Sequence, residues 1–276
     1  MDKLLVIAGG GDYPRQIVEG AKRAGVATVD VLAVKGSCER ATMRAADHAF
    51  PFAVCESERA IRWAAEGGYD GAVLAGQVSP LSLFRGKLGP VVLGWLREMP
   101  VKNAHTIFGK LVSEFEKAGV RMIPASSYME DHLPGEGLLT KRGLTDLERS
   151  DAARGFHVAA DVGRHDVGQT VLVKSGMVLA VEAFEGTNAA ILRAGKLSRG
   201  SVLCKCAREG HDWRFDIPVV GLKTLKVMKK AGVTALAFQA GRLLLLDREA
   251  VVAFADRHGI AIVGVETGLP PAPTRP

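Results

Sequence analysis

Short apolar runs alternate with amphipathic stretches through roughly the first 125 residues. The apolar runs are residues 4–8, 29–34 and 72–75, and the amphipathic stretches are residues 14–24 and 57–66. Such alternation favours a parallel sheet with helices on both faces. A longer helix is expected over residues 103–118, followed by a short strand at 121–123. We therefore expect a Rossmann-like first half.

The second half has a different pattern, in which strands also follow one another directly. Thr145 and Glu148 have the spacing of a capping box that opens a helix. Residues 169–174 and 177–184 predict two strands joined through Ser175-Gly176, which is a hairpin. Further strands are expected at 202–207 and 235–239, and further helices at 222–231 and from Asp247 to about His258. This half is predicted to be mixed α/β.

A length of 276 residues favours two domains. Turn residues concentrate at Leu133-Pro134-Gly135-Glu136-Gly137, so the boundary is expected there. We predict a Rossmann-like nucleotide-binding domain over residues 1–133 and a catalytic α/β domain over residues 138–267. Residues 268–276 are rich in proline and are expected to form a flexible tail.

The composition is that of a globular protein, with 47% hydrophobic and 24% charged residues. No apolar run approaches the roughly 20 residues that span a bilayer, so we expect a cytoplasmic protein. The four cysteines form no paired framework and are expected to be reduced thiols.

Positive charge is concentrated late in the chain. Between Arg193 and Lys230, ten Lys and Arg residues stand against three acidic residues. A solvated basic helix face is one reading, and contact with phosphate or with the anionic inner leaflet of a membrane is another. Nucleic acid is the least favoured partner, because aromatic residues make up only 6% of the chain and do not interleave with the basic stretch.

A glycine-rich turn follows the first predicted strand. Gly9, Gly10, Gly11 and Asp12 precede the first helix, where backbone amides and a helix amino terminus suit phosphate. A tight strand-to-helix turn explains the same glycines, and the spacing is not that of a dinucleotide fingerprint. Gln77 follows the strand at 72–75 and would project from the same sheet edge, where its amide could contact a base or ribose.

Two further segments carry carboxylates. Glu182 and Glu185 stand at a strand end before Thr187, where helix capping is the commoner role; Glu185 also suits contact with metal or phosphate. Asp216 lies between two apolar residues close to Arg214. If the segment is extended, the two side chains share a face and form a surface pair; alternatively, Asp216 holds a divalent cation or positions water.

Several short segments form an ordered set along nearly the whole chain. They are residues 7–14, Gly76-Gln77-Val78 with Leu83-Phe84, and residues 166–174, 180–187, 214–221 and 239–241. This set resembles the LpxI family of UDP-2,3-diacylglucosamine pyrophosphatases. The resemblance implies a magnesium-dependent hydrolase of lipid A biosynthesis, in which water attacks the α-phosphorus and releases UMP and lipid X, the 2,3-diacylglucosamine 1-phosphate. It also implies two domains that enclose the substrate.

The resemblance supplies the expected site. Asp216 stands where the aspartate essential for activity in the family lies, so Asp216 and Arg214 are expected to be catalytic, with Asp216 and Glu185 binding Mg²⁺. Substrate binding is expected at Gly9, Gly10, Gly11, Asp12, Gln77, Gln169, Lys174 and Thr187. The expected partners are UDP-2,3-diacylglucosamine, the inner membrane through peripheral contact, and a second copy of the chain in a homodimer.

Some residues depart from the family pattern. Asn188 replaces an aspartate, Leu222 replaces a proline, and residues 103–108 differ before the long helix. Because an amide is a weaker metal ligand than a carboxylate, we assign no metal to Asn188. A nicotinamide-dependent oxidoreductase and a noncatalytic nucleotide-sugar binding protein are the alternatives; the first predicts NAD binding, and turnover of substrate with magnesium separates the second from the hydrolase.

Overall fold

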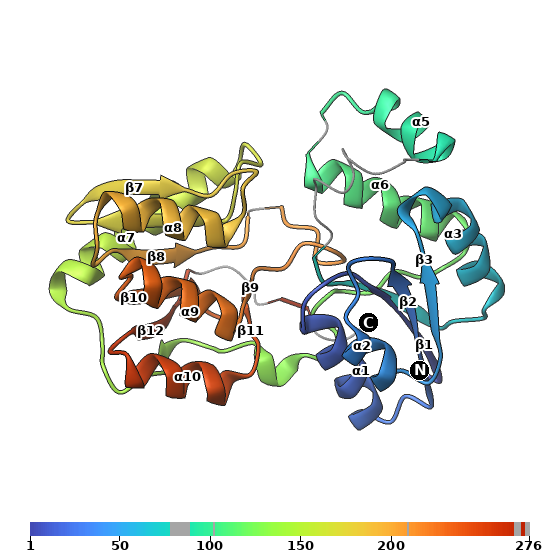
Figure 1. The fold of residues 1–276 in the computed structure, drawn as a ribbon, viewed down its shortest axis with the longest axis horizontal. Coiled ribbons are helices and arrows are strands. Elements are labelled where there is room, and N and C mark those ends of the chain that lie inside the picture. The colour runs from blue at the N-terminus through green and yellow to red at the C-terminus, as the bar shows by residue number, and fades with distance from the viewer. Residues whose placement is uncertain (78–88, 102, 209, 268–271, 274–276) are drawn as a thin grey trace. The chain divides into compact units, whose positions relative to one another are not determined.

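The chain folds into two compact α/β units, as predicted (Figure 1). The computed structural model describes all residues except 78–88, 102, 209, 268–271 and 274–276. The first unit comprises residues 1–130 and 212–216 with the end of the chain from Pro273, and the second comprises residues 131–211 and 217–272. Val78, Leu83 and Phe84 of the family-like segments lie outside the described residues.

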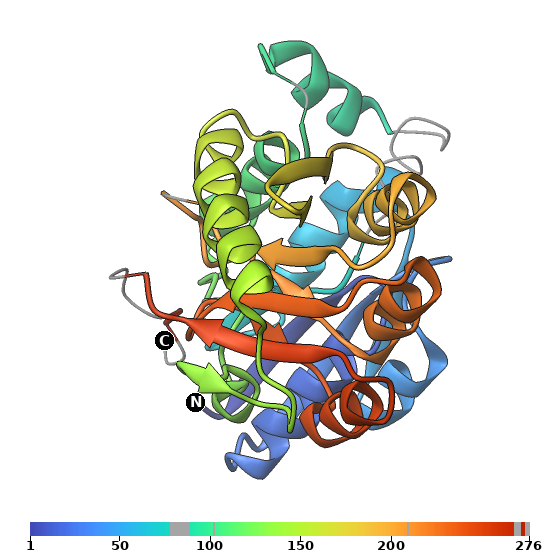
Figure 2. The ribbon, with the colours of Figure 1, turned by 90° about the vertical axis from the view of Figure 1, so that its left-hand side faces the viewer.

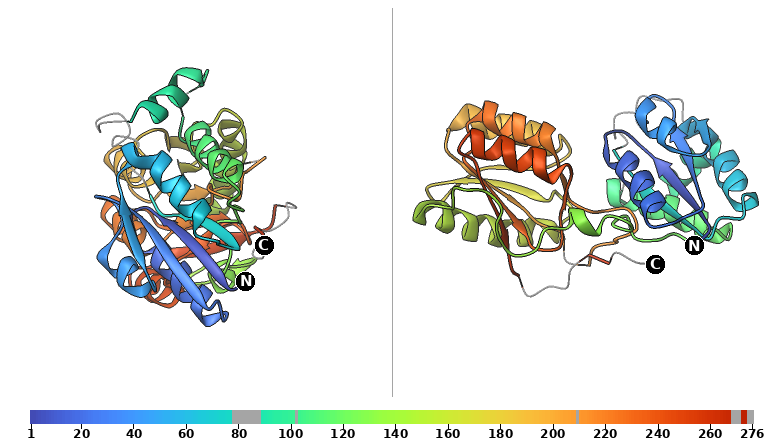
Figure 3. Two further views of the ribbon diagram at one scale, coloured as in Figure 1. Left: turned by 90° about the vertical axis from the view of Figure 1, so that its right-hand side faces the viewer. Right: turned by 90° about the horizontal axis from the view of Figure 1, so that it is seen from below.

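The first unit is built on a sheet of four parallel strands in the order β3-β2-β1-β4 (Figure 3, left). These strands are β1 (Lys3–Ala8), β2 (Thr28–Val34), β3 (Ala49–Phe52) and β4 (Gly71–Ala75). The two inner strands, β1 and β2, are apolar and buried along most of their length, as expected for a parallel sheet between helices. Because every pair is parallel, the carboxyl ends of the strands share one edge.

Helices flank this sheet. The described helices of the first unit are α1 (Tyr13–Arg23), α2 (Arg40–Ala45), η1 (Val54–Glu56), α3 (Ser57–Glu66), α5 (Pro90–Glu98) and α6 (Ala104–Lys117), of which α5 contacts α3 and η1. The long helix predicted at 103–118 is therefore confirmed, and Phe115 of α6 packs with Leu5 and Ile7 of β1 in the core. The strand predicted at 121–123 is reduced to one bridge between Met122 and Ala72.

The second unit is built on a six-stranded sheet in the order β5-β12-β10-β8-β6-β7. Its strands are β5 (Gly137–Leu138), β6 (Thr170–Lys174), β7 (Met177–Val181), β8 (Val202–Lys205), β10 (Ala235–Gln239) and β12 (Ala261–Val265). The predicted hairpin is confirmed by the antiparallel pair β6 and β7. Since β6 is also antiparallel to β8, the start of β6 meets the carboxyl ends of β7 and β8 at one edge. Strands β9 (Val219–Val220) and β11 (Leu244–Leu245) form a separate pair.

Helices cover both faces of this sheet (Figure 2). Helix α7 (Asp146–Gly163) lies on one face, and α8 (Thr187–Leu197), α9 (Leu222–Ala231) and α10 (Arg248–Arg257) lie on the other. A short helix η2 (Glu130–His132) stands where the chain passes from the first unit to the second. The predicted capping box opens α7, where Thr145 and Glu148 exchange hydrogen bonds with each other's backbone N–H. Among the described residues, no helix combines the length and the apolar composition of a membrane span.

Residues 212–216 return to the first unit after β8 of the second. The Trp213 carbonyl accepts a hydrogen bond from the Ala125 N–H at 2.6 Å, and the Phe215 ring lies 5.2 Å from the His105 ring. Asp216 is thus held on the first unit. Of the predicted tail, only Ala272 and Pro273 are described; Ala272 is buried and donates its N–H to the Gly241 carbonyl at 2.8 Å.

Candidate active site

Two loops at the carboxyl edge of the first sheet bind each other through their backbones. The Gly10 N–H donates to the Gln77 carbonyl at 2.7 Å, and the Gln77 N–H donates to the Gly10 carbonyl at 2.9 Å. The Gly9 N–H is also used, because it donates to the Ala75 carbonyl at 2.8 Å. The structure therefore brings these predicted residues together, but the amides of Gly9 and Gly10 join the two loops.

Glycine is required for this close approach. A Cβ on Gly9 would lie 2.7 Å from the Gln77 carbonyl oxygen, and one on Gly76 would lie 2.7 Å from the Gly10 oxygen. Gly76 also has a φ of +88°, which disfavours any residue with a side chain. Gln77 is the next residue after Gly76, and its side chain is exposed.

Asp12 is held by side chains of the helix that it precedes. Its two carboxylate oxygens accept from Arg15 Nε and Nη2, each at 2.7 Å, and Gln16 donates to it as well. The hydrogen bonds from Arg15 outweigh burial and lower the pKa of Asp12. The charge of this carboxylate, which was predicted to bind substrate, is thus balanced by Arg15 of α1.

The segment around Asp216 forms a turn, so the extended conformation considered for it was wrong. The N–H groups of Phe215 and Asp216 both donate to the Asp212 carbonyl, at 3.2 and 3.0 Å. Arg214 consequently turns its guanidinium to Asp212, through Nε and Nη2, and to Glu116 of α6 at 2.7 Å. The turn is thereby fastened to α6.

The charges of this turn balance one another. Burial disfavours ionised Asp212, but hydrogen bonds from the Arg214 side chain and backbone outweigh burial and lower the pKa of Asp212. The same carboxylate raises the pKa of Arg214, with Glu116 contributing. Arg214 thus remains a cation whose described contacts are to two carboxylates.

A second group of polar side chains lies at the carboxyl edge of β8 in the second unit. Lys205 Nζ donates to Thr170 Oγ1 and to Thr187 Oγ1, each at 3.0 Å, and lies 3.7 Å from Glu182 Oε2. Thr187 Oγ1 in turn donates to Glu182 Oε1 at 2.8 Å. The Lys205 side chain is only 5% exposed, so its charge is balanced inside the protein by these groups.

Sequence reasoning missed Lys205 and gave Glu182 no role in the site. The signal for Lys205 is a cation in an otherwise apolar run, Val202-Leu203-Cys204-Lys205-Cys206-Ala207, in a central strand buried on both faces. A lysine is almost never fully buried unless it is paired. Such a residue is a candidate for the site on physical grounds.

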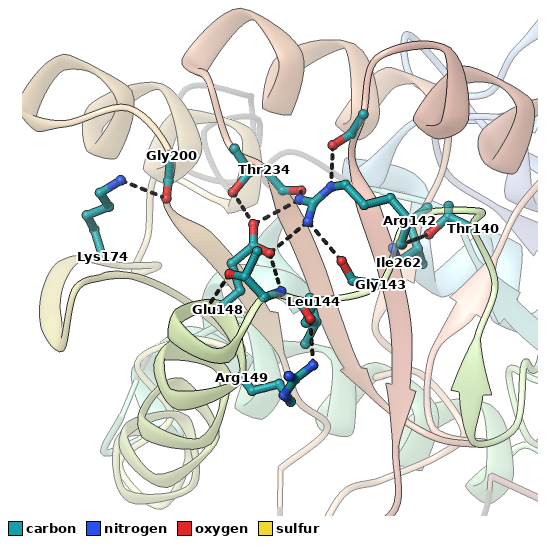
Figure 4. Close-up of polar contacts among 12 residues, drawn as sticks. Thr140, Arg142, Gly143, Leu144, Glu148, Arg149, Lys174, Gly200, Thr234 and Ile262 are labelled. Atoms are coloured by element: carbon teal, nitrogen blue, oxygen red, sulfur yellow. Dashed lines mark hydrogen bonds and ion pairs between the residues drawn. The ribbon is translucent and has the colours of Figure 1, made fainter.

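The structure separates the remaining predicted residues. Gln169 immediately precedes β6 at the edge that holds Thr187, whereas Lys174 ends β6, roughly 16 Å away at the usual rise per residue. Lys174 Nζ instead lies near the Gly200 carbonyl, at 3.3 Å (Figure 4). Glu185 is exposed and bonded to Arg193 at 2.6 Å, a contact that lowers the pKa of Glu185.

The Lys174 edge is stabilised by a different network (Figure 4). Arg142 donates through both terminal nitrogens to Glu148, at 2.8 Å each, and Thr234 Oγ1 donates to Glu148 at 2.7 Å. Burial alone would raise the pKa of Glu148, yet these bonds lower it to about 2. This network joins the start of α7 to the segment before β10, which is a structural role.

Within the described residues, no group of three or more His, Cys, Asp or Glu side chains is arranged to hold a metal ion. A magnesium ion needs fewer protein ligands, because substrate phosphates and water complete its coordination. The donor chemistry at Asp216 fits that arrangement. Glu185 would have to share or leave its contact with Arg193.

Matches to known proteins extend over almost the entire sequence. Residues 3–132 match the LpxI N-terminal domain, and residues 135–263 match the LpxI C-terminal domain. The chain is 31% identical over 281 residues to UDP-2,3-diacylglucosamine pyrophosphatase LpxI of Caulobacter vibrioides, covering 96% of this chain and 98% of that protein.

Likeness to solved structures is weak. The biotin carboxylase subunit of a pyruvate carboxylase aligns with 67% of this chain and 38% of its own, at 16% identity and a TM-score of 0.28. The biotin carboxylase domain of a thermophilic 2-oxoglutarate carboxylase aligns with 62% of this chain and 34% of its own, at 14% identity and the same TM-score of 0.28. These TM-scores are too low to indicate a shared overall fold.

Proposed function

This chain belongs to the LpxI family, and from that membership we propose that it hydrolyses the pyrophosphate bond of UDP-2,3-diacylglucosamine. The products are UMP and 2,3-diacylglucosamine 1-phosphate, and the step belongs to lipid A biosynthesis. The observation that carries the proposal is the 31% identity to a pyrophosphatase of this name along 96% of the chain.

Asp216 is the residue proposed to act on the attacking water. The turn over residues 212–216 is fixed on the first unit by Trp213 and by the ion pairs of Arg214, so the position of Asp216 is set before substrate binds. A carboxylate held in place can accept a proton from the attacking water or orient that water toward the α-phosphorus.

Arg214 is proposed to hold this turn in place and thereby to position Asp216. Because its guanidinium already bonds to Asp212 and Glu116, direct contact with a phosphoryl oxygen would require exchange of one carboxylate. Its contacts support positioning of Asp216 more directly than they support contact with the substrate.

The loops containing Gly10, Gly11 and Gln77 are proposed to hold the UMP half. The fixed backbone pair of Gly10 and Gln77 stands at the carboxyl edge of a parallel sheet, where α/β proteins bind nucleotides. The exposed Gln77 amide can donate to and accept from a uracil or ribose.

Magnesium is proposed as the cofactor, with Asp216 as its protein ligand and Glu185 as a second. When bound, Mg²⁺ would neutralise charge on the phosphate oxygens and favour attack by water. One or two carboxylates together with phosphate and water are the usual environment of this ion.

Turnover tests the proposal. Full-length protein with magnesium should release UMP from UDP-2,3-diacylglucosamine, lose this activity in EDTA and regain it when magnesium is restored. Binding of the substrate without any release of UMP would instead describe a noncatalytic nucleotide-sugar protein. Activity that persists after complete chelation would contradict the proposed need for magnesium and leave the proposed hydrolysis standing.

A further inference from the structure

The hydrogen-bond directions around Lys205 are fixed by chemistry. An ammonium group has only donors, so Thr170 Oγ1 and Thr187 Oγ1 must both accept from Lys205 Nζ, each at 3.0 Å. Thr187 has one hydroxyl hydrogen, and it points to Glu182 Oε1 at 2.8 Å. A ligand that approaches Thr187 Oγ1 therefore meets a lone pair and no hydrogen.

Two buried oxygens, Glu182 Oε2 and Asn188 Oδ1, have no hydrogen-bond donor among the described residues. Glu182 Oε2 lies 3.7 Å from Lys205 Nζ, which is close enough for attraction but too far for a hydrogen bond. Buried acceptors without donors are unusual in native proteins and indicate a missing partner.

The charge of this group argues against phosphate as that partner. Glu182 and Lys205 neutralise each other, and the bond from Thr187 holds the Glu182 carboxylate at the amino end of α8. The helix dipole favours an anion at that end, and the protein itself supplies one. A phosphate oxygen would meet a carboxylate and further acceptors, whereas a neutral O–H or N–H would satisfy them.

We propose that Glu182, Thr187 and Asn188 form a subsite that accepts hydrogen bonds from neutral donors of the acylated sugar, its free hydroxyls or amide N–H groups. Lys205 is the positioning residue, because its bond to Thr187 makes that hydroxyl an acceptor. The inference rests on the proposed function for the identity of the sugar. It keeps Thr187 as a substrate-binding residue and assigns it to the acylated sugar.

Equilibrium binding of the two products tests the subsite, since both carry a phosphate and only 2,3-diacylglucosamine 1-phosphate carries the acylated glucosamine. Titration of full-length protein with 2,3-diacylglucosamine 1-phosphate should show about tenfold weaker binding in Thr187→Val and Glu182→Gln, as expected for loss of one hydrogen bond. Binding of UMP should stay within twofold of wild type. Equal weakening of both ligands, or unchanged sugar binding, would overturn the subsite.

Lys205 is tested by the same pair of ligands. Lys205→Met should weaken the sugar phosphate and spare UMP, and Lys205→Arg should recover part of the loss, because a donor to Thr187 returns. The exposed Lys196→Met on α8 is the matched control and should change neither affinity. Should Lys205→Met fail to fold, Thr187→Val still decides the outcome.

Hydrolysis by wild type is measured alongside. Sugar binding that depends on Thr187, without any hydrolysis, would contradict the proposed function and leave the subsite standing. Hydrolysis by wild type, with sugar affinity unaltered in Thr187→Val, would remove the subsite and leave the function.

Discussion

Arg214 shows how the partner of one residue changes what that residue can do. Its spacing from Asp216 suggests an ion pair on one face of an extended segment, but the chain turns and Arg214 bonds to Asp212 and Glu116. The choice is made by Glu116, which is distant in sequence and reaches the turn from α6. No local pattern around Arg214 contains that information.

Removal of Arg214 should therefore act on catalysis through the turn. Arg214→Met leaves Asp212 and Glu116 without their cation and loosens the segment that carries Asp216. We expect kcat to fall at least about tenfold, as misplacement of a reacting group does, with a smaller change in KM. Steady-state kinetics measures this, with the exposed Arg121→Met as control; an unchanged kcat would exclude the positioning role.

Glu148 predicts a pH dependence of stability. Its pKa of about 2 in the folded protein lies below the ordinary 4.5, so its stabilising effect is complete above pH 4.5 and is lost as the pH falls toward 2. Glu148→Gln should lower the free energy of unfolding by about 2–3 kcal/mol at pH 7. The difference from wild type should shrink near pH 2.

Urea unfolding at several pH values measures the effect, with the exposed Glu136→Gln as control. A difference that is constant from pH 7 to pH 2 would show that ionisation of Glu148 does not contribute.

At the scale of elements, periodicity predicted most helices and strands but not their ends. Helix α6, the capping box of α7 and the β6–β7 hairpin follow from local patterns. The strand predicted at 177–184 stops at Val181; the Glu182 N–H still donates to the Thr170 carbonyl at 2.8 Å, and the Glu182 side chain turns to Thr187 and Lys205. Lys205 was missed for the same reason: its partners come from β6, α8 and the segment after β7.

The paired glycine loops make a prediction about two elements at once. Gly76→Ala places a Cβ 2.7 Å from the Gly10 oxygen at a φ of +88°, whereas Gly25→Ala meets nothing within 4 Å at a φ of +86°. The control should lose about 1–2 kcal/mol of stability from backbone strain alone. Gly76→Ala should lose about 1–3 kcal/mol more from the clash and raise KM.

Thermal unfolding and steady-state kinetics of both variants measure these effects. Equal destabilisation of the two variants would contradict the prediction, because it would mean that the hydrogen bonds between the Gly10 and Gln77 loops do not contribute to stability.

At the scale of the whole molecule, the excess of positive charge lies in the second half of the chain. Four lysines of α9 contribute to it, and Lys223, Lys226, Lys229 and Lys230 are all exposed. A lipid substrate requires access to a membrane, and an anionic leaflet attracts exposed lysines over about a Debye length. We propose that this basic helix assists peripheral contact.

Vesicle sedimentation tests this contact. Full-length protein should bind vesicles with anionic lipid more than neutral vesicles, and binding should fall as salt rises from 50 to 500 mM, about a threefold decrease in screening length. Substitution of the four α9 lysines by Gln should weaken binding, whereas substitution of Lys3, Lys22 and Lys35 on the first unit should not. Binding that is independent of lipid charge and salt would exclude the electrostatic contribution.

The position of Asp216 in the reaction is tested most directly by hydrolysis of UDP-2,3-diacylglucosamine in ¹⁸O-labelled water. Wild type should place the label in UMP, because water attacks the α-phosphorus, and Asp216→Ala should lose nearly all activity while retaining its fold by circular dichroism. Label in the 2,3-diacylglucosamine 1-phosphate, or full activity of Asp216→Ala, would contradict the account.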